Sequence, residues 1–246
     1  MDGSILLWIA LLMAVAAALY SSVGHGGASA YLAIMALFAV APETMRPTAL
    51  ALNLVVAGLG ALRYGLRGQT NYRLLLAFAV TAMPAAFIGG SIHLPPEYYR
   101  PSVGVLLWAA AIRLFWQPKA LAYREVHMPS LFVALPAGAG LGLLAGLTGT
   151  GGGIFLSPLI ILFGWERPRH TSGVAAGFIL LNSVAGLAGN VASVRALPAE
   201  LPILAAAVAA GALLGTWLGV EKLPRERLLQ ALGLVLVVAG YKLVFA

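Results

Sequence analysis

The chain has 246 residues and a formal net charge of +7; 61% of its residues are hydrophobic and only 9% are charged. A soluble domain carries about 25% charged residues, so this composition excludes a solvated surface of ordinary size and predicts a helical protein surrounded by lipid. In such a protein a positive charge indicates loops facing anionic lipid, and not a nucleic-acid partner. Because the chain has no cysteine, disulfides and thiolate chemistry are also excluded.

Ten apolar segments follow one another along the chain. They cover residues 5–20, 29–41, 48–62, 74–92, 103–116, 131–146, 154–164, 173–194, 201–220 and 228–245. The first segment lacks the basic region that precedes a secretory signal, so we expect it to be a retained helix.

Two glycine-rich stretches interrupt these segments at matching places. Residues 24–28 read Gly-His-Gly-Gly-Ala, and residues 149–153 read Gly-Thr-Gly-Gly-Gly. Glycine favours a break in a helix because it loses more backbone entropy on folding than any other residue. Inside a membrane such a break is tolerated only where protein or a cavity satisfies the freed backbone groups. Paired breaks in two halves of a chain indicate the binding site of a transporter.

The two halves of the chain also resemble each other. Several features recur in the same order at a nearly constant offset: Gly24 with Gly149, Pro42 with Pro168, Gly58 with Gly186, Gly89 with Gly215, and Pro96 with Pro224. This order predicts an internal duplication. We expect an N-terminal repeat over residues 1–116, a polar cytoplasmic linker over residues 117–129 and a C-terminal repeat over residues 130–246.

The distribution of Lys and Arg predicts how the repeats are oriented. If each glycine stretch is the tip of a helical hairpin, each repeat has five segments, and one side of the membrane receives eleven cations while the other receives four. The larger group is Arg63, Arg67, Arg73, Arg113, Lys119, Arg124, Arg167, Arg169, Lys222, Arg225 and Arg227; the smaller is Arg46, Arg100, Arg195 and Lys242. If each glycine stretch instead lies within one broken crossing, the division is eight to seven.

Cytoplasmic loops carry the excess of Lys and Arg, so the hairpin arrangement is favoured. We therefore predict an all-α polytopic membrane protein of two inverted repeats, with glycine-rich breaks near the bilayer centre. Both termini are predicted to lie on the non-cytoplasmic side of the membrane. Charge does not decide whether the hairpins cross fully or dip to the midplane, but the short segments after the glycines favour dipping.

None of the eight acidic residues lies in the middle of an apolar segment. A cation pathway normally uses an intramembrane carboxylate, and a hydrolase needs clustered acids or a His-Asp-Ser set. We therefore expect no enzyme, metal site or cofactor. Helices that start after the glycine stretches would direct unpaired N–H groups, with about half a positive charge each, into the protein centre. This pattern predicts a site for a small anion.

The predicted substrate-binding residues come from both glycine stretches and the segments around them. They are Ser22, Gly24, His25, Gly26, Gly27, Asn53, Thr148, Gly149, Thr150, Gly151, Gly152, Gly153 and Asn182. The alternative role for the glycines is tight helix packing. His25 either binds the anion or a coupling proton, or is a neutral histidine bonded to a carbonyl. Asn53 and Asn182 either bind the ligand or join helices by hydrogen bonds.

Four other polar residues have ordinary interpretations. Thr48 and Thr171 open their segments and are interpreted as helix caps. Arg46 and Arg63 lie at segment ends, where long basic side chains reach the lipid surface. An anion gate is the alternative for Arg63.

The residues 22–27 (Ser-Val-Gly-His-Gly-Gly) and 147–153 (Leu-Thr-Gly-Thr-Gly-Gly-Gly) resemble the motifs of the sulfite exporter TauE/SafE family of membrane proteins. Thr171-Ser172, Asn182-Ser183 and Gly186 are similar to the second half of that family. The resemblance implies transport of sulfur-containing anions: sulfite, thiosulfate, or organosulfonates such as sulfoacetate. The first half departs from the second, because Ala49 stands in place of Ser172 and His25 has no counterpart.

The leading hypothesis is a secondary transporter of such anions that works by alternating access. An anion channel on the same scaffold, a membrane enzyme acting on lipid headgroups, and a scaffold subunit without a site are the alternatives. The enzyme would require clustered acids that the apolar segments lack. Since no Walker motif is present, energy would come from a gradient, and a proton or a sodium ion is the candidate coupling ion. The substrate, its direction and the oligomeric state cannot be read from the sequence.

Overall fold

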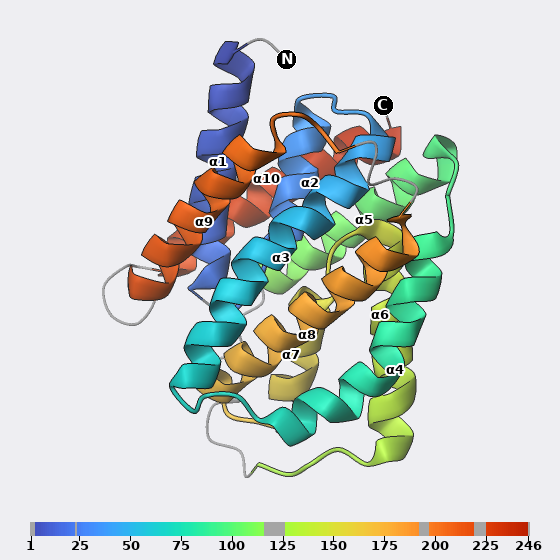
Figure 1. Cartoon of the computed structure of the whole chain (residues 1–246), viewed down its shortest axis with the longest axis vertical. Coiled ribbons are helices and arrows are strands. Elements are labelled where there is room, and N and C mark those ends of the chain that lie inside the picture. Colours follow the sequence, from blue (N-terminus) through green and yellow to red (C-terminus); the bar gives the residue numbers. More distant parts are fainter. Residues whose placement is uncertain (1–2, 23, 116–125, 192–196, 219–224, 246) are drawn as a thin grey trace.

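The structure is a computed structural model and describes residues 3–22, 24–115, 126–191, 197–218 and 225–245. Within these residues the chain forms ten helices and no strand (Figure 1). The helices are α1 (Gly3–Ser21), α2 (Ala28–Leu37), α3 (Pro42–Leu66), α4 (Tyr72–Ser91), α5 (Pro96–Phe115), α6 (Leu131–Thr148), α7 (Gly153–Leu162), α8 (Pro168–Gly189), α9 (Leu201–Leu218) and α10 (Arg225–Phe245). One helix corresponds to each predicted segment, so the all-α prediction is confirmed. The predicted linker lies largely outside the described residues.

Local signals explain where several helices begin. Both α3 and α8 start with a proline, whose fixed φ suits the first helical turn. Asn71 caps α4 by accepting a hydrogen bond from the N–H of Leu74 at 3.0 Å. Thr48 lies inside α3, so the prediction that it caps this helix is wrong. Thr171 lies inside α8 and its hydroxyl donates to the carbonyl of Arg167, the N-cap residue, so Thr171 is not a cap either.

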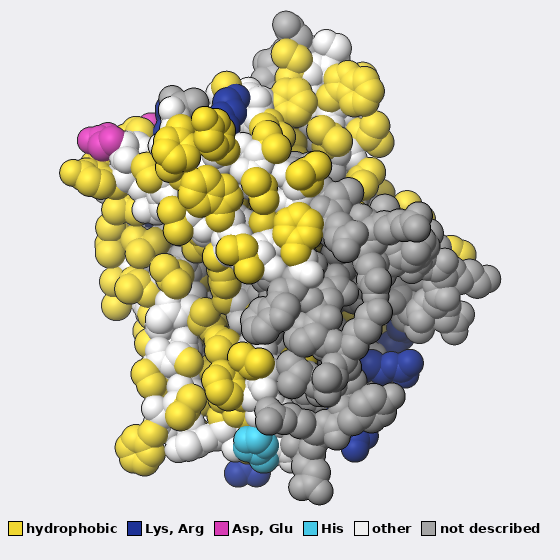
Figure 2. All heavy atoms as spheres, turned by 180° about the vertical axis from the view of Figure 1, so that it is seen from behind, with side chains coloured by type: hydrophobic (Ala, Val, Ile, Leu, Met, Phe, Trp, Pro, Cys, Tyr) yellow, Lys and Arg dark blue, Asp and Glu magenta, His cyan; other side chains and the backbone are white. Residues whose placement is uncertain are grey.

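Five of the described helices are long and apolar enough to cross a membrane: α1, α3, α4, α6 and the Arg169–Gly189 part of α8. Large apolar side chains are exposed along them, such as Leu7, Val80 and Phe132. Figure 2 shows this hydrophobic surface over the upper and left parts of the visible face, with most of the visible Lys and Arg side chains near the lower end. A multi-pass membrane protein has such a surface, because lipid covers the apolar band.

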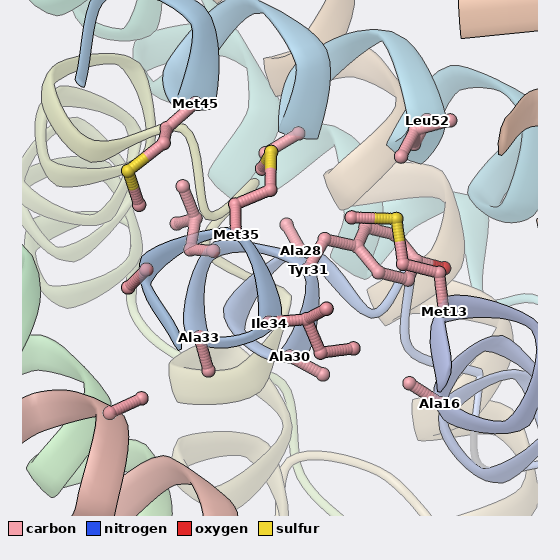
Figure 3. Packing of buried hydrophobic residues seen from close by; sticks show 14 of the residues in the cluster. Met13, Ala16, Ala28, Ala30, Tyr31, Ala33, Ile34, Met35, Met45 and Leu52 are labelled. Carbon is pink, nitrogen blue, oxygen red and sulfur yellow. The ribbon is translucent and has the colours of Figure 1, made fainter. Parts of the chain in front are cut away.

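The two helices that follow the glycine stretches are short and enclosed. Each has ten residues, which corresponds to about 15 Å, half of the roughly 30 Å hydrocarbon core. Every residue of α2 from Ala28 to Ala36 is buried, and Figure 3 shows Met13 of α1 and Met45 and Leu52 of α3 packed around it. In Figure 1, α2 lies toward the end that holds both chain ends, and α7 lies toward the opposite end.

Most of the extensive helix contacts join one half of the chain to the other. The fourth helix of the first half, α4, packs along α6, and the fourth helix of the second half, α9, packs along α1. Helix α3 packs on α8, and α5 packs on α10. The two halves of the chain are therefore interleaved and do not form separate bodies.

Glycine permits the close contact between α4 and α6. A Cβ atom at Gly138 would lie 2.8 Å from the hydroxyl of Thr81, and one at Gly142 would lie 2.6 Å from Cα of Ala82. Such small residues at helix interfaces are the usual means of association in membranes, where lipid tails remove the hydrophobic driving force between helices.

Gly142→Val tests this interface. The added side chain would overlap the backbone of α4, and overpacking of this kind costs about 1–3 kcal/mol, so we expect a lower temperature of thermal unfolding in detergent. Gly140→Val is the matched control, because no atom lies within 4 Å of a Cβ atom added there. Equal unfolding temperatures for the two variants would contradict the α4–α6 packing.

Candidate functional site

The two glycine stretches form tight turns that lead into α2 and α7. Five of their glycines have positive φ: Gly24 (76°), Gly27 (93°), Gly149 (83°), Gly151 (74°) and Gly152 (75°). L-residues with a side chain rarely adopt this conformation, so glycine is required there. Gly27 and Gly152 are the N-cap residues of α2 and α7, and neither helix has a side-chain cap. Both helices therefore present first-turn N–H groups that their own backbone cannot satisfy.

The two turns converge on one asparagine and one isoleucine. A Cβ atom at Gly26 would meet Oδ1 of Asn53, and one at Gly151 would lie 2.7 Å from Nδ2 of the same side chain. These added atoms would also lie 3.0 Å and 2.8 Å from the same Cγ2 methyl group of Ile179. The Asn53 amide therefore lies between the two glycine turns, next to both.

Asn53 and Ile179 occupy equivalent places in the two halves. Each is the twelfth residue of a helix that begins with proline, α3 or α8. Asn182 lies three residues further along α8 and is therefore not the counterpart of Asn53. At the point where the turns meet, one half contributes an amide and the other an aliphatic side chain.

Two asparagines and a serine are fully buried and have no partner among the described residues. Asn53 and Asn182 are 0% exposed, and neither the oxygen nor the nitrogen of either amide forms a hydrogen bond. The Ser183 hydroxyl is equally buried and without a bond, and it lies 3.4 Å from a Cβ atom added at Gly151. Leaving such groups unsatisfied costs about 1–3 kcal/mol each. Within the described structure, these amides do not join helices by hydrogen bonds.

The predicted hydroxyl groups are engaged with their own chain. The Ser22 hydroxyl donates to the carbonyl of Leu19 at 2.7 Å. The Thr148 hydroxyl donates to the carbonyl of Leu144 at 2.6 Å, and the Thr150 hydroxyl lies 3.1 Å from Thr148 Oγ1. Since Thr148 uses its proton toward Leu144, Thr150 is the donor in that pair. These groups shape the turns in this state.

The remaining predicted residues lie around the centre. The half-buried ring of His25 stands edge-on to Tyr20, with centroids 6.2 Å apart. Gly24 packs on Ser172, and Gly149 packs on Arg46. Gly27 lies against Tyr31, whose hydroxyl donates to the carbonyl of Gly26 at 2.9 Å. The last two glycines contact α8: Gly152 lies against Phe178 and Gly153 against Ile179.

Two arginines form contacts that the sequence did not predict. Arg46 is only 5% exposed, so the prediction that it reaches the lipid surface is wrong. It donates hydrogen bonds to the carbonyls of Gly89, Gly90 and Ile92 at the end of α4. Arg63 donates to Thr216 and to the carbonyl of Leu213, so it joins α3 to α9.

The fold and the site define a multi-pass helical membrane protein with a polar centre between two broken helices. The model of the sulfite exporter TauE/SafE family matches residues 9–243, and the chain belongs to that family. It is 39% identical over 240 residues to the probable membrane transporter protein y4hK of Sinorhizobium fredii (strain NBRC 101917 / NGR234). That match covers 96% of this chain and 97% of the relative. No solved structure matches. Family and relative indicate a transporter, and the resemblance seen in the motifs is confirmed.

Ser183, Ile179 and Arg46 were missed as site residues by the sequence reasoning. Ser183 follows Asn182 directly, and this pairing of two polar residues inside an apolar segment is the signal that could have found it. Ile179 gives no signal, because an isoleucine in an apolar helix is ordinary. Its place follows only from the helix register that Pro168 sets.

Asn53→Leu tests whether the Asn53 amide contributes to ligand binding or to the stability of the fold. The substitution removes a buried amide without partners and keeps a similar volume, so we expect an unfolding temperature equal to or above that of the wild type. Anion binding should fall by roughly tenfold or more, because hydrogen bonds to a charged group contribute about 1.5–3 kcal/mol. Isothermal titration and thermal unfolding measure the two effects.

Asn190→Leu is the control for this substitution, because Asn190 is a buried asparagine that ends α8 away from the glycine turns. A clear loss of stability in Asn53→Leu with unchanged binding would assign the amide a structural role.

Proposed function

We propose that this protein is a secondary transporter of small sulfur-containing anions, such as sulfite, thiosulfate or organosulfonates like sulfoacetate, across the bacterial inner membrane by alternating access. The observation that carries the proposal is the Asn53 amide, fully buried, without partners among the described residues, and placed between two glycine turns. The choice of sulfur-containing anions as substrates rests on the family description, sulfite exporter TauE/SafE.

The chemistry of this centre suits an anion. Helix N-termini carry about half a positive charge each and expose N–H donors. The amide nitrogens of Asn53 and Asn182 and the Ser183 hydroxyl add neutral donors that require no counter-charge. Glycine at the turns lets an oxyanion approach the backbone without obstruction by a Cβ atom. In a water-free setting these weak dipoles act more strongly than they would at a surface.

The arrangement of the helices supports alternating access. Short helices enter the centre from opposite ends of the molecule, as Figure 1 shows for α2 and α7. The reciprocal pairs α1–α9 and α4–α6 are those that an inverted duplication would generate. Two related bundles around a fixed midplane site are the usual architecture of carriers that rock between states. A proton, with His25 beside the first turn as its candidate carrier, or a sodium ion would couple the cycle to a gradient.

Charge supports an orientation with the basic end in the cytoplasm. Asn71 donates to Glu166 at 2.6 Å, and the N–H of His127 donates to the carbonyl of Gly164 at 3.1 Å. These bonds bring the α3–α4, α5–α6 and α7–α8 connections to one end of the molecule. The same connections and the adjoining helix ends carry Arg67, Arg73, Arg167 and Arg169. By the positive-inside rule this end is cytoplasmic and the termini are on the opposite side.

Ligand-dependent thermal stabilisation tests the proposed function. A ligand that binds only the folded protein raises its stability by roughly 2.7 kcal/mol at a hundredfold excess over the dissociation constant. We expect sulfite, thiosulfate or sulfoacetate to stabilise the purified protein more than sulfate, phosphate or acetate does. Gly151→Ala should abolish the effect through strain at positive φ and contact with Asn53, while Gly140→Ala should retain it. No stabilisation by any sulfur-containing anion would overturn the substrate class.

Labelling of single introduced cysteines tests the orientation. Because the chain has no cysteine of its own, only the introduced residue can react. We expect a membrane-impermeant maleimide added to intact cells to label Glu97→Cys at the start of α5. Arg67→Cys at the end of α3 should react only after the membrane is opened. The reverse pattern would contradict the assignment of the basic end to the cytoplasm.

A further inference from the structure

A buried guanidinium group lies at the edge of the candidate site. Arg46 is 5% exposed inside α3, and its terminal nitrogens donate to three carbonyls at the end of α4: Gly89 at 3.2 Å, Ile92 at 2.8 Å, and Gly90. Its Nε atom is buried and has no partner among the described residues. The charge is therefore held by neutral carbonyl oxygens, and one N–H donor remains unused.

Arg46 is built into the second glycine turn. A Cβ atom at Gly149 would lie 3.1 Å from the carbonyl oxygen of Arg46 and 3.2 Å from its Cγ atom. The adjacent Thr148 carbonyl accepts a hydrogen bond from the buried Tyr99 hydroxyl at 3.1 Å. The backbone and aliphatic stem of the arginine thus support the turn that leads to Gly151 and Asn53.

The equivalent contact in the other half carries no charge. Arg46 and Ser172 are each the fifth residue of their helices, α3 and α8. A Cβ atom at Gly24 would lie 2.6 Å from both Cα and Cβ of Ser172, which repeats the contact between Gly149 and Arg46. The structure therefore keeps the same packing in both halves and adds a cation to only one.

The carbonyls that hold Arg46 offset only part of its charge. A helix C-terminus carries about half a negative charge, whereas the guanidinium carries a full positive one that stays ionised in proteins. A charge inside a membrane protein is costly unless a partner is close, and intramembrane arginines mark substrate pathways for this reason. An anion at the neighbouring glycine turns would supply the missing negative charge.

We propose that Arg46 is the specificity-determining cation of this transporter: its fixed charge at the second glycine turn makes the site prefer dianions over monoanions. The inference rests on the proposed function and deepens it. Arg46 acts through its electric field and through the turn that it supports. The preference follows because a second negative charge on the ligand adds a second unit of attraction to the guanidinium, beyond the attraction that the partial charges of the helix N-termini supply.

The test compares two sulfur-containing anions of different charge, thiosulfate (a dianion) and methanesulfonate (a monoanion), by isothermal titration of the purified protein. Arg46→Gln keeps a hydrogen-bond donor and removes the charge, so the ratio of thiosulfate to methanesulfonate affinity should fall roughly tenfold or more. Arg46→Lys keeps the charge and loses the planar fork, so the ratio should stay close to that of the wild type. Arg63→Gln is the control, since Arg63 belongs to the same helix and contacts α9 instead of the site.

The outcomes distinguish an effect of the Arg46 charge on anion selectivity from a purely structural role of Arg46. If Arg46 only caps α4, both substitutions weaken the two anions alike and the ratio does not move, which overturns the inference. If Arg46→Gln does not fold, Arg46→Met replaces it as the neutral variant: a ratio at least roughly tenfold below that of Arg46→Lys supports the role of charge, and equal ratios in the two variants overturn it. If the wild type binds anions through Asn53 but Arg46→Gln leaves the ratio unchanged, the proposed function stands and the inference falls. Binding of neither anion by the wild type overturns the inference, and the proposed function falls with it if sulfite and sulfoacetate also fail to bind.

Discussion

The structure depends on two glycine turns that open helices α2 and α7 and converge on one buried amide. A broken backbone in lipid needs polar partners, because no water is there to replace them. Here two breaks are brought to one buried place, beside an amide that has no partner among the described residues. This concentrates donors and partial positive charge at one buried place. A small anion is the ligand that we propose for this centre, and its binding would stabilise both turns together.

Small residues let the helices around this centre pack closely. Four of the ten residues of the enclosed helix α2 are alanines, and glycines along α4 and α6 let the backbones of these two helices approach. Because the fourth helix of each half packs on the first helix of the other, motion of one half relative to the other would change contacts on both sides of the site. This coupling is what alternating access requires, since a carrier must never open to both sides at once.

Local features of the sequence predicted the ten helices and both glycine breaks, because apolar runs, proline starts and glycine turns act over short distances. Long-range features were not predictable. Thr148 and Thr150 looked like free donors, but the structure binds both to the chain, and a hydroxyl's partner depends on rotamers that sequence does not specify. Arg46 looked like a surface residue because its helix begins earlier than its apolar segment. The convergence of Gly26 and Gly151 on one side chain required the three-dimensional packing of α3 on α8.

The most direct test of the central claim is the position of a bound anion in an experimental structure. Selenite, an analogue of sulfite with an anomalous scatterer, marks that position without ambiguity. The account predicts one strong anomalous peak between the two glycine turns, within hydrogen-bonding distance of the Asn53 amide and of first-turn N–H groups of α2 or α7. An ordered selenite held elsewhere in the protein, with the space between the turns filled by side chains, would contradict it.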